Sequence, residues 1–191
     1  MNLGRRTTVA GCLLALLFGV AACDAGAAAP VPAATTGSAA PSGAGHFGGT
    51  DLAWVEINIA MNEELAPLLA LAATHSSSAE TKALAAETAA LNDRELGTLR
   101  GLHDQAGLPA ENPHKGMPMP GMVTPEQVTQ AEAARGAAFD ALLVRHLRAH
   151  FEQGVKLAGS EQQAGIEPQT KALAALVITG RERLLPRLKA H

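Results

Sequence analysis

Two histidines one helical turn apart are the side chains of this chain best suited to hold a metal ion. His146 and His150 lie in the apolar stretch from Phe139 to Ala158, and side chains four residues apart on a helix share one face. Their imidazoles could therefore chelate one divalent ion, and imidazole suits copper, zinc and nickel. The alternative is that both histidines are structural, either partly buried or solvated at one end of a helical bundle.

A second set of candidate ligands lies in a loop rich in Pro, Gly and Met between residues 109 and 123. This loop offers three thioethers and one imidazole, which are soft enough for Cu(I). The four residues are His114, Met117, Met119 and Met122. The alternative is that these methionines close over the domain as packing.

Four helices must position these residues, because apolar side chains recur at helical spacing in four stretches. Capping residues, Gly and Pro mark where each stretch begins and ends. The expected helices run from Thr50 or Asp51 to the serines at 76–78, from a Ser77–Glu80 capping box to Gly107, from Thr124 to about Ala158 before a turn at 159–165, and from Pro168 toward Pro186.

An internal repeat organises these helices. Residues 51–102 and 140–191 align without a gap and share 14 identical pairs, including the run 81–86 with 170–175. Each repeat is a helical hairpin, and two hairpins bury their apolar faces together. We therefore expect an all-α fold, an antiparallel four-helix bundle built from two repeated hairpins. The repeat places Met61 opposite His150, so our hypothesis is a weak copper site made by His146, His150 and Met61.

The N-terminal segment has the pattern of a lipoprotein signal. Arg5 and Arg6 precede a short apolar run that ends in Val-Ala-Ala-Cys23, a pattern too short for a membrane span and typical of an export signal. It resembles the lipobox at which a bacterial lipoprotein is cut and the cysteine lipidated. We predict a signal peptide at 1–22, lipidated Cys23 with an Ala/Gly/Pro tether at 23–49, and the bundle at 50–191. The pattern does not separate the general from the twin-arginine export route.

Composition excludes several functions. Removing Arg5 and Arg6 from the 15 basic residues leaves 13 against 18 acidic residues, a formal charge of −5, so nucleic acid is not an expected partner. Cys12 lies in the signal and Cys23 carries the lipid, so no thiol remains for a disulfide. The sequence contains no nucleophile motif or phosphate loop, and we predict no enzymatic activity.

Several segments resemble a known bacterial family. They are Gly121-Met122-Val123-Thr124-Pro125-Glu126, Gly136-Ala137-Ala138-Phe139-Asp140, His150 with Glu152 and Leu157-Ala158, and in the second helix Leu84-Ala85, Asn92, Glu95-Leu96 and Leu99. Over roughly residues 50 to 190 the chain is similar to the domain of unknown function 305 (DUF305). The resemblance implies a ferritin-like four-helix fold. The family's mark is a His-His pair in each repeat, where this chain has Met61-Asn62 and His150-Phe151.

The resemblance also implies a metal. Some members of the family are associated with copper handling in the cell envelope. His150 matches a family histidine, Glu152 matches a flanking acidic position, and Met61 stands where the family has a histidine.

We therefore expect a non-enzymatic, lipid-anchored protein of the bacterial cell envelope that binds copper weakly. The alternative is a structural or protein-interaction lipoprotein that has lost the family's metal site. The expected partner is the membrane, through the lipid on Cys23, and an exposed apolar stripe would permit a homodimer.

Overall fold

The structure is a computed structural model, and it describes residues 46–188. The predicted signal peptide, Cys23 and almost all of the predicted tether lie outside the described residues. The helices are α1 (Gly49–His75), α2 (Ala79–Ala106), α3 (Pro125–Ala133), α4 (Gly136–Ala164), α5 (Pro168–Leu184) and the short 3₁₀ helix η1 (Leu185–Arg187).

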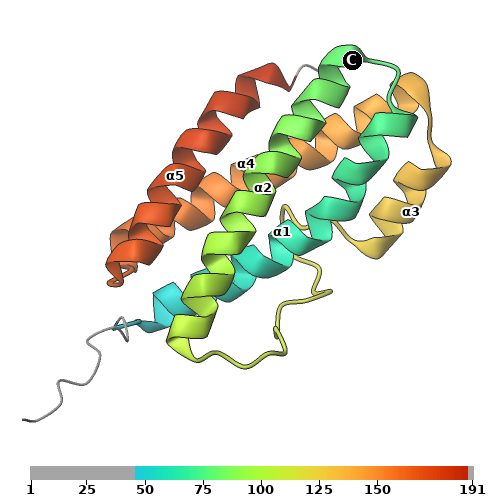
Figure 1. The fold of residues 1–191 in the computed structure, drawn as a ribbon. Helices are drawn as coiled ribbons and strands as arrows, with labels where there is room; N and C mark the ends of the chain where they lie inside the picture. The colour runs from blue at the N-terminus through green and yellow to red at the C-terminus, as the bar shows by residue number, and fades with distance from the viewer. Residues whose placement is uncertain (1–45, 189–191) are drawn as a thin grey trace, which may run out of the picture. The chain divides into compact units, whose positions relative to one another are not determined.

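The four long helices form two hairpins that pack against each other (Figure 1). One hairpin consists of α1 and α2 and the other of α4 and α5; α1 packs on α4, α2 packs on α5, and α3 lies beside α1. Residues 46–188 contain no strand. The predicted all-α bundle of two hairpins is confirmed.

The caps at the helix starts follow the sequence signals to within one or two residues. Thr124 and Gln127 form the predicted capping box of α3, in which the Thr124 N–H donates to Gln127 Oε1 over 3.0 Å. The cap of α2 was predicted one residue too early, because Ser78, not Ser77, accepts the Thr81 N–H over 3.1 Å. The N-cap of α1 is Gly48 rather than Thr50 or Asp51.

The predicted third helix is wrong, because the chain breaks between α3 and α4. Ala134 and Arg135 are extended, and Gly136 has a φ of 58°, in the left-handed region that favours glycine. Arg135 Nη1 donates to the carbonyls of Glu132 and Ala134, which satisfies acceptors that the end of α3 leaves open. The break lets α3 pack on α1 while α4 packs on α1 and α5.

The predicted turn at 159–165 is also wrong for most of its length, because α4 continues to Ala164. The chain turns at Gly165 instead. A Cβ at Gly165 would lie 1.9 Å from Oε1 of Glu161. Only glycine therefore leaves room for the Glu161 carboxyl beneath this turn.

The core consists of two large apolar clusters and a small one. The first includes both phenylalanines of α4, Phe139 and Phe151, and the second surrounds Trp54. The small cluster contains Met61 and Met122. Among residues 46–188, no helix is both long and apolar enough to cross a membrane.

Candidate functional site

His150 is the buried centre of the candidate site. Its side chain is 1% exposed on the inward face of α4. Burial, followed by the nearby charge of Arg181, lowers the pKa of His150 to about 3, against the opposing effect of a hydrogen bond to the backbone of Gly121. The imidazole is therefore neutral at physiological pH, and its Nδ1 has no hydrogen-bond partner. A neutral ring that is oriented by a backbone bond at one nitrogen and open at the other is the form in which histidine binds metals.

Gly121 brings the Met-rich loop directly onto α4. Its φ is 76°, and a Cβ there would lie 2.5 Å from Cβ of Gln153 and 2.8 Å from the carbonyl oxygen of Ala149. No other residue fits so close to the helix in this conformation. The residue that follows is Met122, so the close approach of Gly121 to α4 also sets the course of the loop into the core.

The structure joins methionines from the two predicted ligand sets. Met61 of α1 is 1% exposed and Met122 of the loop is 6% exposed. They pack together with Ala60, and Met119 lies against the same cluster. We call Met61, Met119 and Met122 the methionine cluster. Two sets of ligands that the sequence analysis treated separately therefore meet on one side of the bundle.

The other predicted ligands differ in how far they are buried. His146 is buried on α4 with its Nε2 unpartnered, and burial, followed by the charge of Arg145, lowers its pKa. His114 is half-buried in the loop, and its Nδ1 has no partner. Met117 and Glu152 are exposed. Across residues 46–188, no three His, Cys, Asp or Glu side chains gather closely enough to hold a metal ion.

Sequence reasoning missed a buried ion pair beside the site. Arg181 of α5 donates from Nη1 and Nη2 to the two oxygens of Glu95 on α2, over 2.9 and 2.6 Å. Their side chains are 3% and 5% exposed. Asn62 donates to Glu95 over 3.2 Å, and Asn92 donates to the Asn62 carbonyl over 2.9 Å. The Glu95 carboxylate and both terminal nitrogens of Arg181 therefore have buried polar partners, as burial of charge requires, whereas Arg181 Nε has none.

Arg181 also lies over the ring of Phe151, with its guanidinium carbon 5.3 Å from the ring centre. Asn62 and Phe151 are equivalent residues of the two repeats. Both contact the ion pair: Asn62 donates to Glu95, and the ring of Phe151 packs against the guanidinium of Arg181. A signal for Arg181 existed, since it follows Leu173 and Val177 at helical spacing on the buried stripe of α5.

A second buried titratable group lies at the start of α1. The Asp51 carboxylate accepts the N–H groups of Gly48, Ile166 and Glu167 over 2.7, 3.0 and 3.0 Å. Glu161 is 0% exposed, and neither of its oxygens receives a bond from an N–H or hydroxyl donor. Burial, then a hydrogen bond to Asp51 and the Asp51 charge, raises the pKa of Glu161 to about 8. With its pKa raised to about 8, the Glu161 carboxyl is protonated at neutral pH.

The fold and its buried centre define a class, that of helical bundles made from two hairpin repeats around a polar core. The model of the domain of unknown function DUF305 matches residues 60–190. The chain belongs to this family, as its sequence motifs suggested.

Solved structures of the same family share the fold. A DUF305 protein from Streptomyces coelicolor, described as a candidate secreted protein, is 19% identical with a TM-score of 0.65, over 73% of this chain and 89% of that one. A DUF305 fragment from Deinococcus radiodurans is 14% identical with a TM-score of 0.66, over 74% and 94%. A search among curated proteins finds no match. At these identities the likeness shows the fold alone.

Proposed function

We propose that this protein is a non-enzymatic, lipid-anchored protein of the bacterial cell envelope that binds copper weakly, with Cu(I) preferred. The observation that carries the proposal is the free, buried Nδ1 of His150 in a neutral imidazole. A buried polar atom without a partner costs free energy. A metal bond at this nitrogen would remove that cost.

The proposed ligands are His150 and the methionine cluster, with His146 as a further donor. Thioethers are soft ligands that favour Cu(I) and serve zinc poorly. Because no three His, Cys, Asp or Glu side chains of residues 46–188 gather into a metal site, a harder ion such as Zn²⁺ would lack ligands here. One imidazole with thioethers also explains why we propose weak binding.

The export pattern and the family support the location. Cys23 directly follows Val-Ala-Ala in the lipobox pattern, and a relative of the same family is described as a candidate secreted protein. Two or three acyl chains, each contributing about 0.8 kcal/mol per buried methylene, would hold the domain on a membrane.

A competition titration with a chromogenic Cu(I) chelator tests the copper proposal. The full chain in mild detergent is compared with Met122→Leu, which preserves the side-chain volume and removes the sulfur, and with Met117→Leu as a matched control. We expect Met122→Leu to weaken Cu(I) binding about tenfold, roughly 1.4 kcal/mol, and Met117→Leu to leave it unchanged because Met117 is exposed. Equal affinity in all three proteins would refute the proposed site.

A second function is favoured by the ion pair of Glu95 and Arg181. Because Asn62 and Phe151 serve that pair, half of the family's histidine positions are filled by a structural network. In this alternative the protein is a structural or protein-interaction lipoprotein. The same titration separates the two functions, since the alternative requires that wild type and both variants bind no Cu(I).

A further inference from the structure

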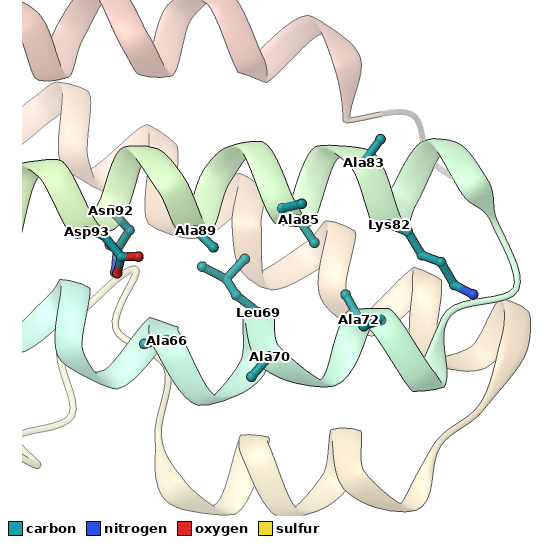
Figure 2. A pocket seen from close by; sticks show the side chains of 12 residues that line it. Ala66, Leu69, Ala70, Ala72, Lys82, Ala83, Ala85, Ala89, Asn92 and Asp93 are labelled. Atoms are coloured by element: carbon teal, nitrogen blue, oxygen red, sulfur yellow. The ribbon is translucent and has the colours of Figure 1, made fainter.

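A groove lined mainly by alanine runs between α1 and α2. Its volume is about 630 Å³, and Figure 2 shows its walls from close by. Almost all of the wall residues are small and apolar. They include Ala66, Leu69 and Ala70 on α1, and Ala83, Ala86 and Ala89 on α2. The two helices therefore leave a shallow apolar surface that another helix could approach closely.

The two ends of the groove carry opposite charges. Lys82 lies at the end near the turn from α1 to α2, and Asp93 lies at the other end (Figure 2). Both side chains are exposed, and neither has an ion-pair partner among residues 46–188. At 1.5 Å per residue, about 16 Å of helix separates them. A ligand with the opposite order of charges would match both ends.

A buried acceptor at the acidic end also lacks a partner. Asn92 lines the groove next to Asp93 and is 1% exposed. Its amide nitrogen donates to the Asn62 carbonyl, but its Oδ1 accepts no hydrogen bond. A cation that docks at this end would meet the Asp93 carboxylate, and the buried Asn92 oxygen beneath it adds negative potential there.

We propose that the groove binds α2 of a second copy of this chain, so that the protein forms a two-fold symmetric dimer. Exposed alanines at 79, 83, 86 and 90 recur on α2 at spacings of four, three and four residues, which is the seam of a closely packed helix pair. In this dimer, α2 of each copy lies in the groove between α1 and α2 of the other copy. Such a pairing is isologous, as two-fold symmetry demands.

The charges fix the register of this dimer. A two-fold axis between positions 87 and 88, halfway between Lys82 and Asp93, sets the two copies of α2 antiparallel. Lys82 of each copy then lies over Asp93 of the other, near the buried Asn92 oxygen. The proposed dimer therefore pairs both exposed charges, and it does so twice.

A repeat-matched pair of variants tests the surface. Ala86 lies near the proposed axis, and Ala175 is its equivalent on α5, exposed in the same way. The full chain in mild detergent is examined by sedimentation velocity from micromolar to near-millimolar concentration. We expect wild type and Ala175→Glu to be dimers, and Ala86→Glu to be a folded monomer by circular dichroism. A wild type that stays monomeric, or a dimer that survives Ala86→Glu, would overturn the proposal.

A charge exchange tests the register. Lys82→Asp alone and Asp93→Lys alone should each weaken the dimer at least tenfold, because each places like charges together twice. The double variant should recover the affinity, and an equimolar mixture of the two single variants should form the heterodimer, in which both pairs attract. If the double variant stays as weak as the singles, or the mixture does not associate, the proposed register is wrong.

Discussion

Asp51 in the first repeat and Asp140 in the second are equivalent residues, and each reaches the turn of the other hairpin. Asp51 accepts the N–H groups of Ile166 and Glu167 at the turn between α4 and α5. Asp140 accepts the Ser77 hydroxyl over 3.2 Å at the turn between α1 and α2. Ser77 and Ile166 are themselves equivalent. In each direction, therefore, an aspartate of one hairpin accepts hydrogen bonds from the turn of the other hairpin.

The two repeats make equivalent hydrogen bonds at their turns but different polar contacts in the middle of their helices. Asn62 and Asn92 in the first repeat form a hydrogen bond, and their equivalents in the second, Phe151 and Arg181, form a cation–π contact. Glu95 has Leu184 as its equivalent, so only the first repeat supplies a carboxylate for Arg181. The comparison teaches that the helices and their turns follow the repeat, while the polar centre depends on the two halves being different.

The largest expected effect comes from making the centre of the second repeat apolar. Arg181→Met leaves the Glu95 carboxylate buried without its partner, which costs about 3–5 kcal/mol. Urea unfolding monitored by circular dichroism measures this loss. The double variant Arg181→Met with Glu95→Leu should regain most of it. A double variant no more stable than the single would show that packing, not the unpaired charge, carries the effect.

The equivalent aspartates should differ in their contributions. Asp51→Ala removes the acceptor of three backbone N–H groups, two of them on the other hairpin, and we expect it to cost roughly 3 kcal/mol at about 1 kcal/mol for each orphaned donor. Asp140→Ala removes the acceptor of one partly buried hydroxyl and should cost about 1 kcal/mol. The two free energies of unfolding are compared at pH 6. Equal losses would mean that the shared position, not the number of donors, determines the contribution.

The carboxyl of Glu161, whose equivalent in the first repeat is Ala72, should make stability depend on pH. Its pKa is raised from 4.5 to about 8 in the folded state, so its stabilisation is full below about pH 4.5 and is lost as the pH rises through about 8. The steepest loss is about 1.4 kcal/mol per pH unit. Unfolding midpoints between pH 4 and 9 measure it, and Glu161→Gln should abolish the alkaline fall.

The contribution of His150 to the free energy of unfolding has the opposite dependence on pH. Its pKa falls from 6.5 to about 3 on folding, so the free energy of unfolding declines as the pH drops below 6.5. Between about pH 4.5 and 6.5 the fall from Glu161 opposes the rises from His150 and from His146, whose pKa is also lowered by burial. The free energy of unfolding of Glu161→Gln should therefore rise more steeply with pH in this range than that of wild type. Equal slopes in the two proteins would contradict the assignment of Glu161.

The smallest effect concerns a cap that the two repeats build from different residues. Ser78 caps α2 by accepting the Thr81 N–H, and its equivalent Glu167 caps α5 by accepting the N–H and hydroxyl of Thr170. Ser78→Ala should lower the free energy of unfolding by about 1 kcal/mol. Glu167→Ala should cost more, because it orphans two buried donors. Thermal unfolding of both variants checks the order.

The repeat made most of the fold predictable, but the local departures from the repeat could not be predicted. The identical run at 81–86 and 170–175 aligned the hairpins correctly, because side-chain spacing carries that information. The break before α4 depends on the positive φ of Gly136, and glycine occurs often enough elsewhere that its presence alone did not mark a break. The turn at Gly165 depends on where the Glu161 carboxyl lies, which only the folded chain decides.

The candidate ligands were proposed from the sequence, but their arrangement could not be. The repeat aligns Met61 with His150. The contact of Met61 with Met122 depends on the course of the loop, which the close approach of Gly121 to α4 sets, and such a tertiary contact has no periodic signal. The ion pair could not be predicted from the helix pattern, because a buried stripe predicts apolar residues and Arg181 is a charged residue at a buried position of that stripe.

The hydrogen bonds of Asp51 also have a mechanical consequence. A force that pulls on residues 46–48 passes through Gly48, whose N–H is bonded to the Asp51 carboxylate. The same carboxylate accepts the N–H groups of Ile166 and Glu167. Both of these belong to the opposite hairpin, so tension on the start of α1 is shared by both halves of the bundle. The first turn of α1 is thereby protected from unwinding under load.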